Sequence, residues 1–244
     1  MRESFSNKIL GKLGFNVLKS GKEIELVGLK KIETLRLVFS YFSFLLLGWG
    51  LYRLLFRLPE SIEETILKPI FWLGSLFWVI KYRDKKPFSS LGISTKGLFR
   101  SLYLGLGLGF LFAFEGVAVN WVKYGGLSFS PLDYSLKNLL GLFLISVITA
   151  ISEELVFRGF IFNRLLEVWK KEWFTNLVVS FLFALVHLPV TIFVLRYDFG
   201  QVLTYAFIVF VYSLGSGFVF ARTKTITASV LLHVFWSWPL ILFR

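Results

Sequence analysis

Two histidines and two adjacent glutamates are the residues of this sequence best suited to chemistry. His187 and His233 are its only histidines, and both lie inside apolar stretches rather than in polar connections. Glu153 and Glu154 lie in a third apolar stretch. An ionisable side chain in hydrocarbon costs at least about 2.5 to 3.5 kcal/mol, so each of these positions needs a reason. Carboxylates and imidazoles that meet around water are suited to general acid–base chemistry.

Helical spacing gives the two glutamates different neighbours. Successive residues of an α-helix differ by about 100° in direction, so Glu153 and Glu154 diverge. Glu154 and Arg158 are four residues apart on one helix face and can form an ion pair. Glu153 is then free for another role. The alternative is that both glutamates and Arg158 lie solvated at the cytoplasmic end of their helix.

The same spacing of four residues gives each histidine a defined neighbour. Phe183 precedes His187, so its ring can pack against the imidazole and limit its rotamers. Ser237 follows His233 and places a hydroxyl beside the second imidazole. The alternatives are ordinary packing for Phe183 and a hydrogen bond from Ser237 to its own helix.

The composition predicts that membrane-crossing helices position these residues. The chain has 244 residues, of which 56% are hydrophobic and 17% charged, and its mean hydropathy is +0.70. Its apolar blocks are about 18 to 25 residues long, the length needed to cross about 30 Å of hydrocarbon. We therefore expect an all-α polytopic transmembrane helical bundle of seven spans, at about residues 37–58, 62–80, 97–122, 136–157, 176–195, 201–221 and 225–243.

The chain divides into three parts. Residues 1–36 carry apolar residues at helical spacing with lysines between them, which predicts an amphipathic helix at the membrane surface. An eighth span would require that helix to insert. Residues 37–135 hold the first three spans, and residues 136–244 hold the later spans with all the motifs above. In the second span, Lys68 is placed to pair with Glu64 and to snorkel toward water.

Basic residues set the expected orientation. Of 27 lysines and arginines, 19 lie in residues 1–36 and in every second connection after them, and Arg100 lies at the adjoining start of the third span. Because lysine and arginine accumulate in cytoplasmic connections, we expect an integral protein of the plasma membrane with a cytoplasmic N-terminus. The glutamates and histidines then fall in the cytoplasmic half, and we expect the cavity they share to open toward the cytoplasm, so that its chemistry takes place near that face. This distribution accounts for the net charge of +12 and excludes nucleic acid as a partner.

Three motifs in separate late spans carry a resemblance to a known family. They are Glu-Glu-x-x-x-Arg, Phe-x-x-x-His and His-x-x-x-Ser, in this order. The ordered set resembles the CPBP family of intramembrane proteases, also called ABI, which contains the CAAX prenyl endopeptidases and bacteriocin-processing enzymes. The resemblance covers about residues 136–243, while the first three spans match only as generic membrane helices.

The resemblance implies catalytic roles for the motif residues. Glu153 or Glu154 would activate water for peptide hydrolysis, His187 would assist it, and His233 with the residue four positions on would stabilise the oxyanion. The family usually has asparagine where this sequence has Ser237, and a hydroxyl reaches less far than an amide. The expected substrate is a peptide or a membrane-anchored protein in the lipid bilayer, prenylated or not.

The residues leave three alternatives open. Glu153, His187 and His233 could hold a divalent metal such as zinc, with one position left for water, as in a metalloprotease. A non-catalytic membrane scaffold or a bacteriocin-immunity-type protein could keep the same fold, and Ser237 favours this interpretation. Buried carboxylates and imidazoles also build proton-coupled carriers. The ion pair predicted for Glu154 disfavours a carrier, because an ion-paired carboxylate holds its charge.

Overall fold

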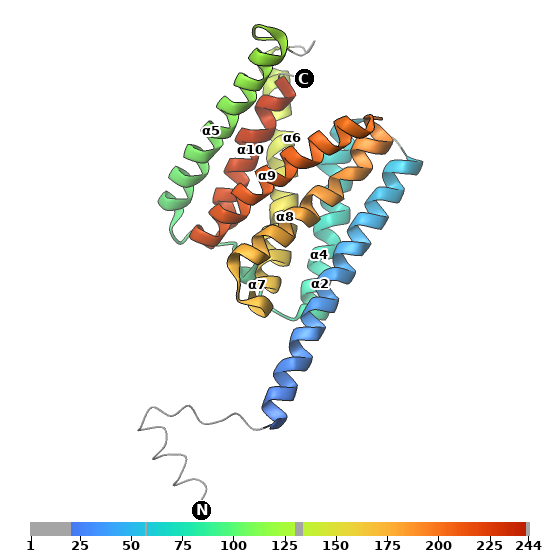
Figure 1. Ribbon diagram of the computed structural model, residues 1–244, viewed down its shortest axis with the longest axis vertical. Helices are drawn as coiled ribbons and strands as arrows, with labels where there is room; N and C mark the ends of the chain where they lie inside the picture. The colour runs from blue at the N-terminus through green and yellow to red at the C-terminus, as the bar shows by residue number, and fades with distance from the viewer. Residues whose placement is uncertain (1–20, 57, 130–133, 243–244) are drawn as a thin grey trace, which may run out of the picture.

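The computed structural model describes residues 21–56, 58–129 and 134–242, and every regular element in these ranges is helical (Figure 1). The α-helices are α2 (Gly21–Leu55), α3 (Glu60–Ile62), α4 (Ser75–Val79), α5 (Leu98–Tyr124), α6 (Leu136–Glu154), α7 (Asn163–Trp169), α8 (Glu172–Pro189), α9 (Phe199–Thr223) and α10 (Ile226–Leu242). The π-helical and 3-10 segments are η1 (Glu63–Leu67), η2 (Pro69–Gly74), η3 (Ile80–Asp84), η4 (Phe88–Leu91), η5 (Leu155–Phe162) and η6 (Val190–Val194). The predicted all-α class is confirmed.

Within the described ranges, five helical stretches are long and apolar enough to cross a membrane. They are Glu25–Leu55, Leu98–Val122, Leu136–Trp169, Glu172–Val194 and Phe199–Thr223. This supports a polytopic bundle, but the predicted count of seven is not confirmed. The second predicted span is a series of short α- and π-helical pieces, and the last contains a shorter apolar helix. The predicted amphipathic helix of the first 20 residues lies outside the described residues.

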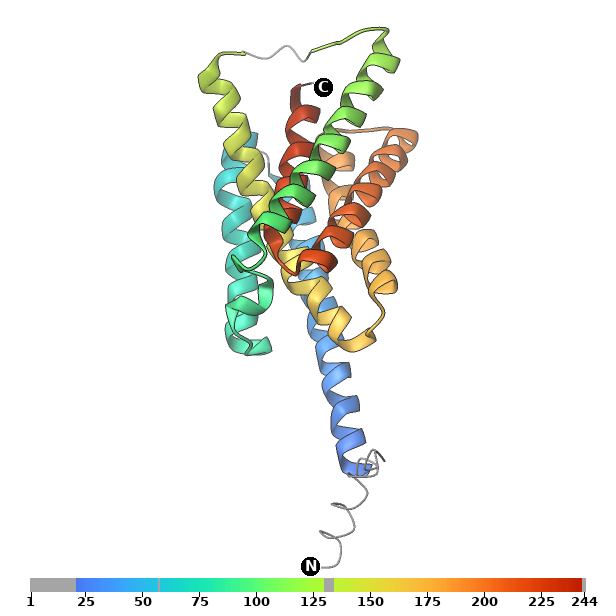
Figure 2. The same ribbon diagram turned by 90° about the vertical axis from the view of Figure 1, so that its left-hand side faces the viewer.

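The helices pack around α10, which carries His233. α10 lies against α5, α6 and α9, and α8 packs on α9 (Figures 1 and 2). Two glycines of α5 allow its close approach to α10. A Cβ atom at Gly105 would lie 2.8 Å from the carbonyl oxygen of Ala228, and one at Gly109 would lie 2.8 Å from Cβ of Phe235. Small residues permit this distance between helices in a membrane bundle, so α5 fixes the position of α10.

The helix that carries the glutamates is longer than the sequence predicted. We expected it to end at about residue 157, whereas α6, η5 and α7 form one continuous helical stretch of 34 residues, Leu136–Trp169. Arg158 and Arg164 resemble the start of a solvated connection in the sequence, yet both are 0% exposed. Each pairs inside the protein, Arg164 with Asp84 at 2.7 Å. The glutamates therefore lie near the middle of a long helix, not at its end.

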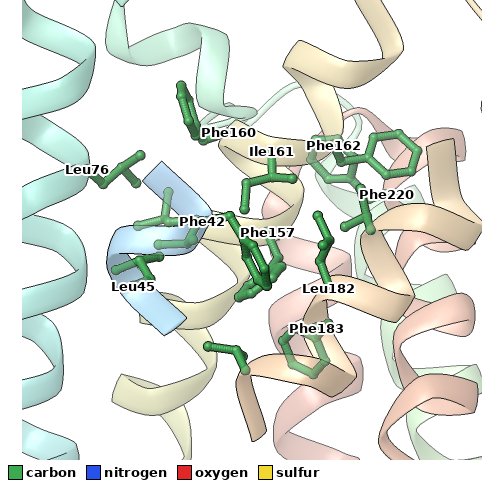
Figure 3. Packing of buried hydrophobic residues seen from close by; sticks show 14 of the residues in the cluster. Phe42, Leu45, Leu76, Phe157, Phe160, Ile161, Phe162, Leu182, Phe183 and Phe220 are labelled. Atoms are coloured by element: carbon green, nitrogen blue, oxygen red, sulfur yellow. The ribbon is translucent and has the colours of Figure 1, made fainter. Parts of the chain in front are cut away.

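Aromatic side chains fill the bundle where η5 continues beyond the glutamates. Phe157, Phe160 and Phe162 are fully buried, and Phe220 of α9 packs on Phe162 with ring centroids 5.6 Å apart (Figure 3). Phe157 also lies edge-on to Phe183 at 4.8 Å. Such pairs contribute about 0.5 to 1.5 kcal/mol each beyond the burial of their area. We call Phe157, Phe160, Phe162 and Phe220 the aromatic floor.

Candidate active site

The two glutamates are buried rather than solvated. Glu153 is 2% exposed, and Glu154 and Arg158 are 0% exposed. They lie where α6 passes into the π-helical segment η5, and π-helical turns are frequent at functional sites. The alternative of solvated carboxylates at a helix end is therefore wrong. Buried charges require partners, and the partners of the two residues differ.

Four side chains hold Glu154 in place. Tyr212 donates a hydrogen bond from its hydroxyl to Oε1 at 2.8 Å, and Ser216 donates one to Oε2 at 2.9 Å. Nδ1 of His233 lies 3.0 Å from Oε1, and Nε of Arg158 lies 3.2 Å from Oε2. The last contact is the ion pair that the spacing predicted. Both oxygens of Glu154 are thus engaged inside the protein.

Arg158 contacts Ser213 and Phe183 in addition to Glu154. Its guanidinium donates to the carbonyl oxygen of Ser213 at 3.0 Å and to the hydroxyl of the same residue at 2.8 Å. It also lies over the ring of Phe183, 4.6 Å from the centroid. That ring is 4.7 Å from the imidazole of His187 between centroids. The predicted packing of Phe183 against His187 is present, and the same ring covers Arg158.

Glu153 has one bound oxygen and one without a hydrogen bond. Oε1 accepts a hydrogen bond from Nζ of Lys68 at 2.5 Å. Oε2 is buried and has no hydrogen-bond partner in the part of the chain that the structure describes. It lies 3.7 Å from Nε2 of His187 and 3.8 Å from Nε2 of His233. Helices α6, α8 and α10 thus bring one carboxylate oxygen and two imidazole nitrogens together.

The other nitrogen of each imidazole is already used. Nδ1 of His187 lies 2.7 Å from the carbonyl oxygen of Phe183, which only accepts, so Nδ1 carries the proton. Nδ1 of His233 donates in the same way to the carboxylate of Glu154. A neutral imidazole then has its acceptor at Nε2, and a protonated one has a second donor there. Both Nε2 atoms face Glu153, where they can act on a shared ligand.

These groups line a cavity of about 1040 Å³. Glu153, His187, His233 and Ser237 all contribute to its wall. The hydroxyl of Ser237 is buried and has no hydrogen-bond partner among the described residues, so the alternative bond to its own helix is not formed. The hydroxyl of Ser146, which lines the same cavity, is in the same state. Two hydroxyls and one carboxylate oxygen are therefore available to a bound ligand.

Lys68 is the site residue that sequence reasoning missed. Its pairing with Glu64 is present at 2.8 Å, but the side chain is only 6% exposed and does not snorkel to water. Nζ instead reaches Glu153 across the bundle. Arg53 pairs with Glu64 at 2.9 Å and with Glu63, so a row of buried charges runs from α2 to the glutamates. The sequence feature that could have identified Lys68 is its position inside an apolar block. The same criterion had identified Glu153.

The geometry does not support the metalloprotease alternative. In the described ranges, no group of three or more histidine, cysteine, aspartate or glutamate side chains is arranged to hold a metal ion. The ammonium group of Lys68 also lies against Glu153, so a divalent cation there would meet a like charge. The three predicted ligands, Glu153, His187 and His233, therefore do not fit a zinc site, and we derive no step through a metal.

Comparison with known proteins places the chain beside one protease family. Residues 135–239 match the family model described as type II CAAX prenyl endopeptidase, Rce1-like. No curated protein and no solved structure matched the chain. The match falls on α6 to α10, which carry the three motifs, and confirms the predicted resemblance to the CPBP and CAAX proteases. The match and the apolar helices together show that the later part of the chain is similar to a family of membrane proteases.

Proposed function

We propose that this protein is an intramembrane endopeptidase in which Glu153 activates water. The observation that supports this proposal is the position of its Oε2, which lies 3.7 Å and 3.8 Å from two imidazole Nε2 atoms on the wall of a cavity. Glu154, the other predicted candidate, has both oxygens engaged and is absent from the cavity lining. Glu154 therefore positions His233 rather than acting as the base.

The proposed reaction begins with a water molecule between Oε2 of Glu153 and the histidines. The carboxylate accepts a proton from this water while the oxygen of the water attacks the scissile carbonyl carbon. The carbonyl π electrons move to the carbonyl oxygen, which becomes an oxyanion. His187, fixed by the carbonyl of Phe183, orients the water through Nε2. When the intermediate collapses, the C–N bond breaks and Glu153 passes its proton to the leaving amine.

The oxyanion is stabilised from α10. His233, with Nδ1–H on the carboxylate of Glu154, presents Nε2 to the cavity and donates from it when protonated. The carboxylates of Glu153 and Glu154 both lie beside this imidazole and favour its protonated form. The hydroxyl of Ser237 adds a second donor, since it is free of partners among the described residues and lies on the same wall. Preorganised donors of this kind are commonly the largest contribution to catalysis of acyl transfer.

The test is peptide cleavage by the full-length protein reconstituted in liposomes with a library of membrane-anchored peptides. Wild type is compared with Glu153→Gln and His187→Ala, and with Glu167→Gln as a control. Glu167 pairs with Lys86 at the surface, away from the cavity. We expect cleavage by wild type and by the control, and loss of cleavage in both site variants. Equal cleavage in all four proteins contradicts the mechanism.

The same preparation separates the alternatives. A wild type that cleaves no peptide in the library supports the non-catalytic scaffold, which Ser237 in place of the family's asparagine favours. Proton flux into liposomes without peptide supports the carrier. Cleavage that disappears on chelation and returns with added zinc supports the metal alternative. We expect cleavage to be unchanged by chelation, because the ammonium of Lys68 on Oε1 of Glu153 disfavours a second cation at the same carboxylate.

A further inference from the structure

The basic connections of the chain meet at one end of the bundle. They lie between η3 and α5, between α7 and α8, and between α9 and α10. Contacts between these connections and the adjoining helix ends are Arg164 to Asp84 at 2.7 Å, Lys86 to Glu167, Arg222 to Glu172 at 2.6 Å, and the backbone bond from Ile226 to Gly92 at 3.1 Å. α2 begins beyond this same end (Figure 2). We call it the basic end.

The aromatic floor separates the glutamates from the basic end. Phe157, Phe160 and Phe162 follow Glu154 along η5 toward α7, and Phe220 lies near the end of α9. All four rings are at most 1% exposed; Phe162 packs on Phe220, Phe157 on Phe183 and Phe160 on Tyr41 (Figure 3). None of the residues that line the cavity belongs to the basic connections. The site is therefore closed toward the basic end.

The opposite end of the bundle is where the cavity reaches the surface. Its lining includes the turn from α2 to α3, the last residue of α5 and the turn from η6 to α9. The side chains at this mouth are solvent-exposed, and they include Leu58, Glu60, Tyr124, Asp198 and Gln201. α10 ends and α6 begins at the same end (Figure 2). A substrate segment thus reaches Glu153 from the end remote from the basic connections.

We infer that the site opens on the extracytoplasmic face, and that its substrate is a membrane-anchored polypeptide segment presented from that face. Basic connections lie on the cytoplasmic side of membrane proteins, and the cavity opens at the other end. The sequence had placed Glu153 near the cytoplasmic face because the helix was expected to end at about residue 157; it continues to Trp169. The substrate part of this inference rests on the proposed function. The direction in which the cavity opens does not depend on it.

The class of substrate follows from the end of the bundle at which the cavity is closed. A prenylated C-terminus anchored in the cytoplasmic leaflet would meet the aromatic floor, not the cavity mouth. A segment that hangs from the outer leaflet, or the outer part of a transmembrane anchor, would lie directly beside the mouth at α3, η6 and α9.

Single cysteines test the access route, because the chain has none of its own. Glu60→Cys marks the mouth, Val190→Cys marks the cavity wall, and Lys171→Cys marks the basic end. We expect a membrane-impermeant thiol reagent added to intact cells to modify the first two positions. The third should react only after the membrane is permeabilised. Reaction of Val190→Cys from the same side as Lys171→Cys overturns the inference, whatever the activity of the protein.

A second experiment tests the substrate side. The wild-type protein is inserted in one orientation into liposomes that hold an anchored peptide with its scissile segment on one face only. We expect cleavage when that face is the one from which Glu60→Cys is labelled, and none when it is the other. Cleavage only from the basic end overturns the inference. If neither face supports cleavage, the proposed peptidase fails, while the labelling still decides the route of access.

Discussion

The two neighbouring glutamates differ in how completely their carboxylate oxygens are satisfied. On the side of Glu154, both carboxylate oxygens have partners at 2.8 to 3.2 Å. On the side of Glu153, the buried atoms without hydrogen-bond partners in the described chain include Oε2 of Glu153 and the hydroxyls of Ser146 and Ser237, all on the cavity. Buried polar atoms are normally hydrogen-bonded. This difference supports our proposal that Glu154 holds the structure while Glu153 acts on a ligand.

The largest expected effect is on the Glu153 side. Glu153→Gln keeps the size and shape of the side chain but removes the base, so we expect kcat to fall by about 10²- to 10⁴-fold. Lys68 keeps Glu64 as a partner at 2.8 Å when the charge of Glu153 is removed, so the melting temperature should fall less than in Glu154→Gln. Peptide cleavage and thermal unfolding in detergent measure the two quantities. A variant that still cleaves at the wild-type rate would give Glu153 a structural role only.

Glu154→Gln should affect the stability of the protein more than Glu153→Gln does. It removes the charge that balances Arg158 inside the bundle, and breaking a buried ion pair from one side costs about 3 to 5 kcal/mol of stability. We therefore expect a clear fall in melting temperature, together with a loss of activity through misplacement of His233. The double variant Glu154→Gln with Arg158→Met leaves no lone charge and should recover part of the stability. Equal melting temperatures for wild type and Glu154→Gln contradict the assignment.

Lys68 sharpens the comparison because it contacts only the Glu153 side. Lys68→Met leaves Glu153 without its 2.5 Å partner, and a displaced catalytic group can lower the rate by about 10²-fold. As a positioning residue, Lys68 should affect kcat with little change in KM. Lys68→Arg restores the charge and should recover part of the rate. A variant that loses folding in place of kcat, with no rescue by arginine, would assign Lys68 to stability alone.

Ser237 is expected to give the smallest effect. Ser237→Ala removes one donor from the oxyanion site, and we expect a fall in kcat of about tenfold, the strength of one hydrogen bond to a charged group. Ser237→Asn introduces the residue usual in the family and should equal or exceed wild type. Cleavage rates at saturating peptide provide the measurement. Unchanged rates in Ser237→Ala, beside a large loss in Glu153→Gln, would leave His233 as the main donor.

The sequence identified the site residues largely through two local rules. Ionisable side chains inside apolar blocks marked Glu153, His187 and His233, because burial in hydrocarbon requires a reason. Spacing of four residues predicted the contact of Glu154 with Arg158, which the structure shows at 3.2 Å. Both rules failed where a charged side chain pairs with a residue on another helix. The sequence allowed Arg158 to lie solvated at a helix end and predicted that Lys68 snorkels to water. Neither rule contains information about contacts between different helices.

What the sequence by itself determined is the helical architecture and the contacts within single helices, since apolar block length and the helical repeat fix both. The tertiary structure decided the division of labour between Glu153 and Glu154. It rests on contacts with Lys68 and Tyr212, which are 85 and 58 residues away along the chain. It also decided where the cavity opens. Contacts between distant residues depend on how helices pack, and helix packing is set by side-chain shape over the whole bundle, which no local pattern encodes.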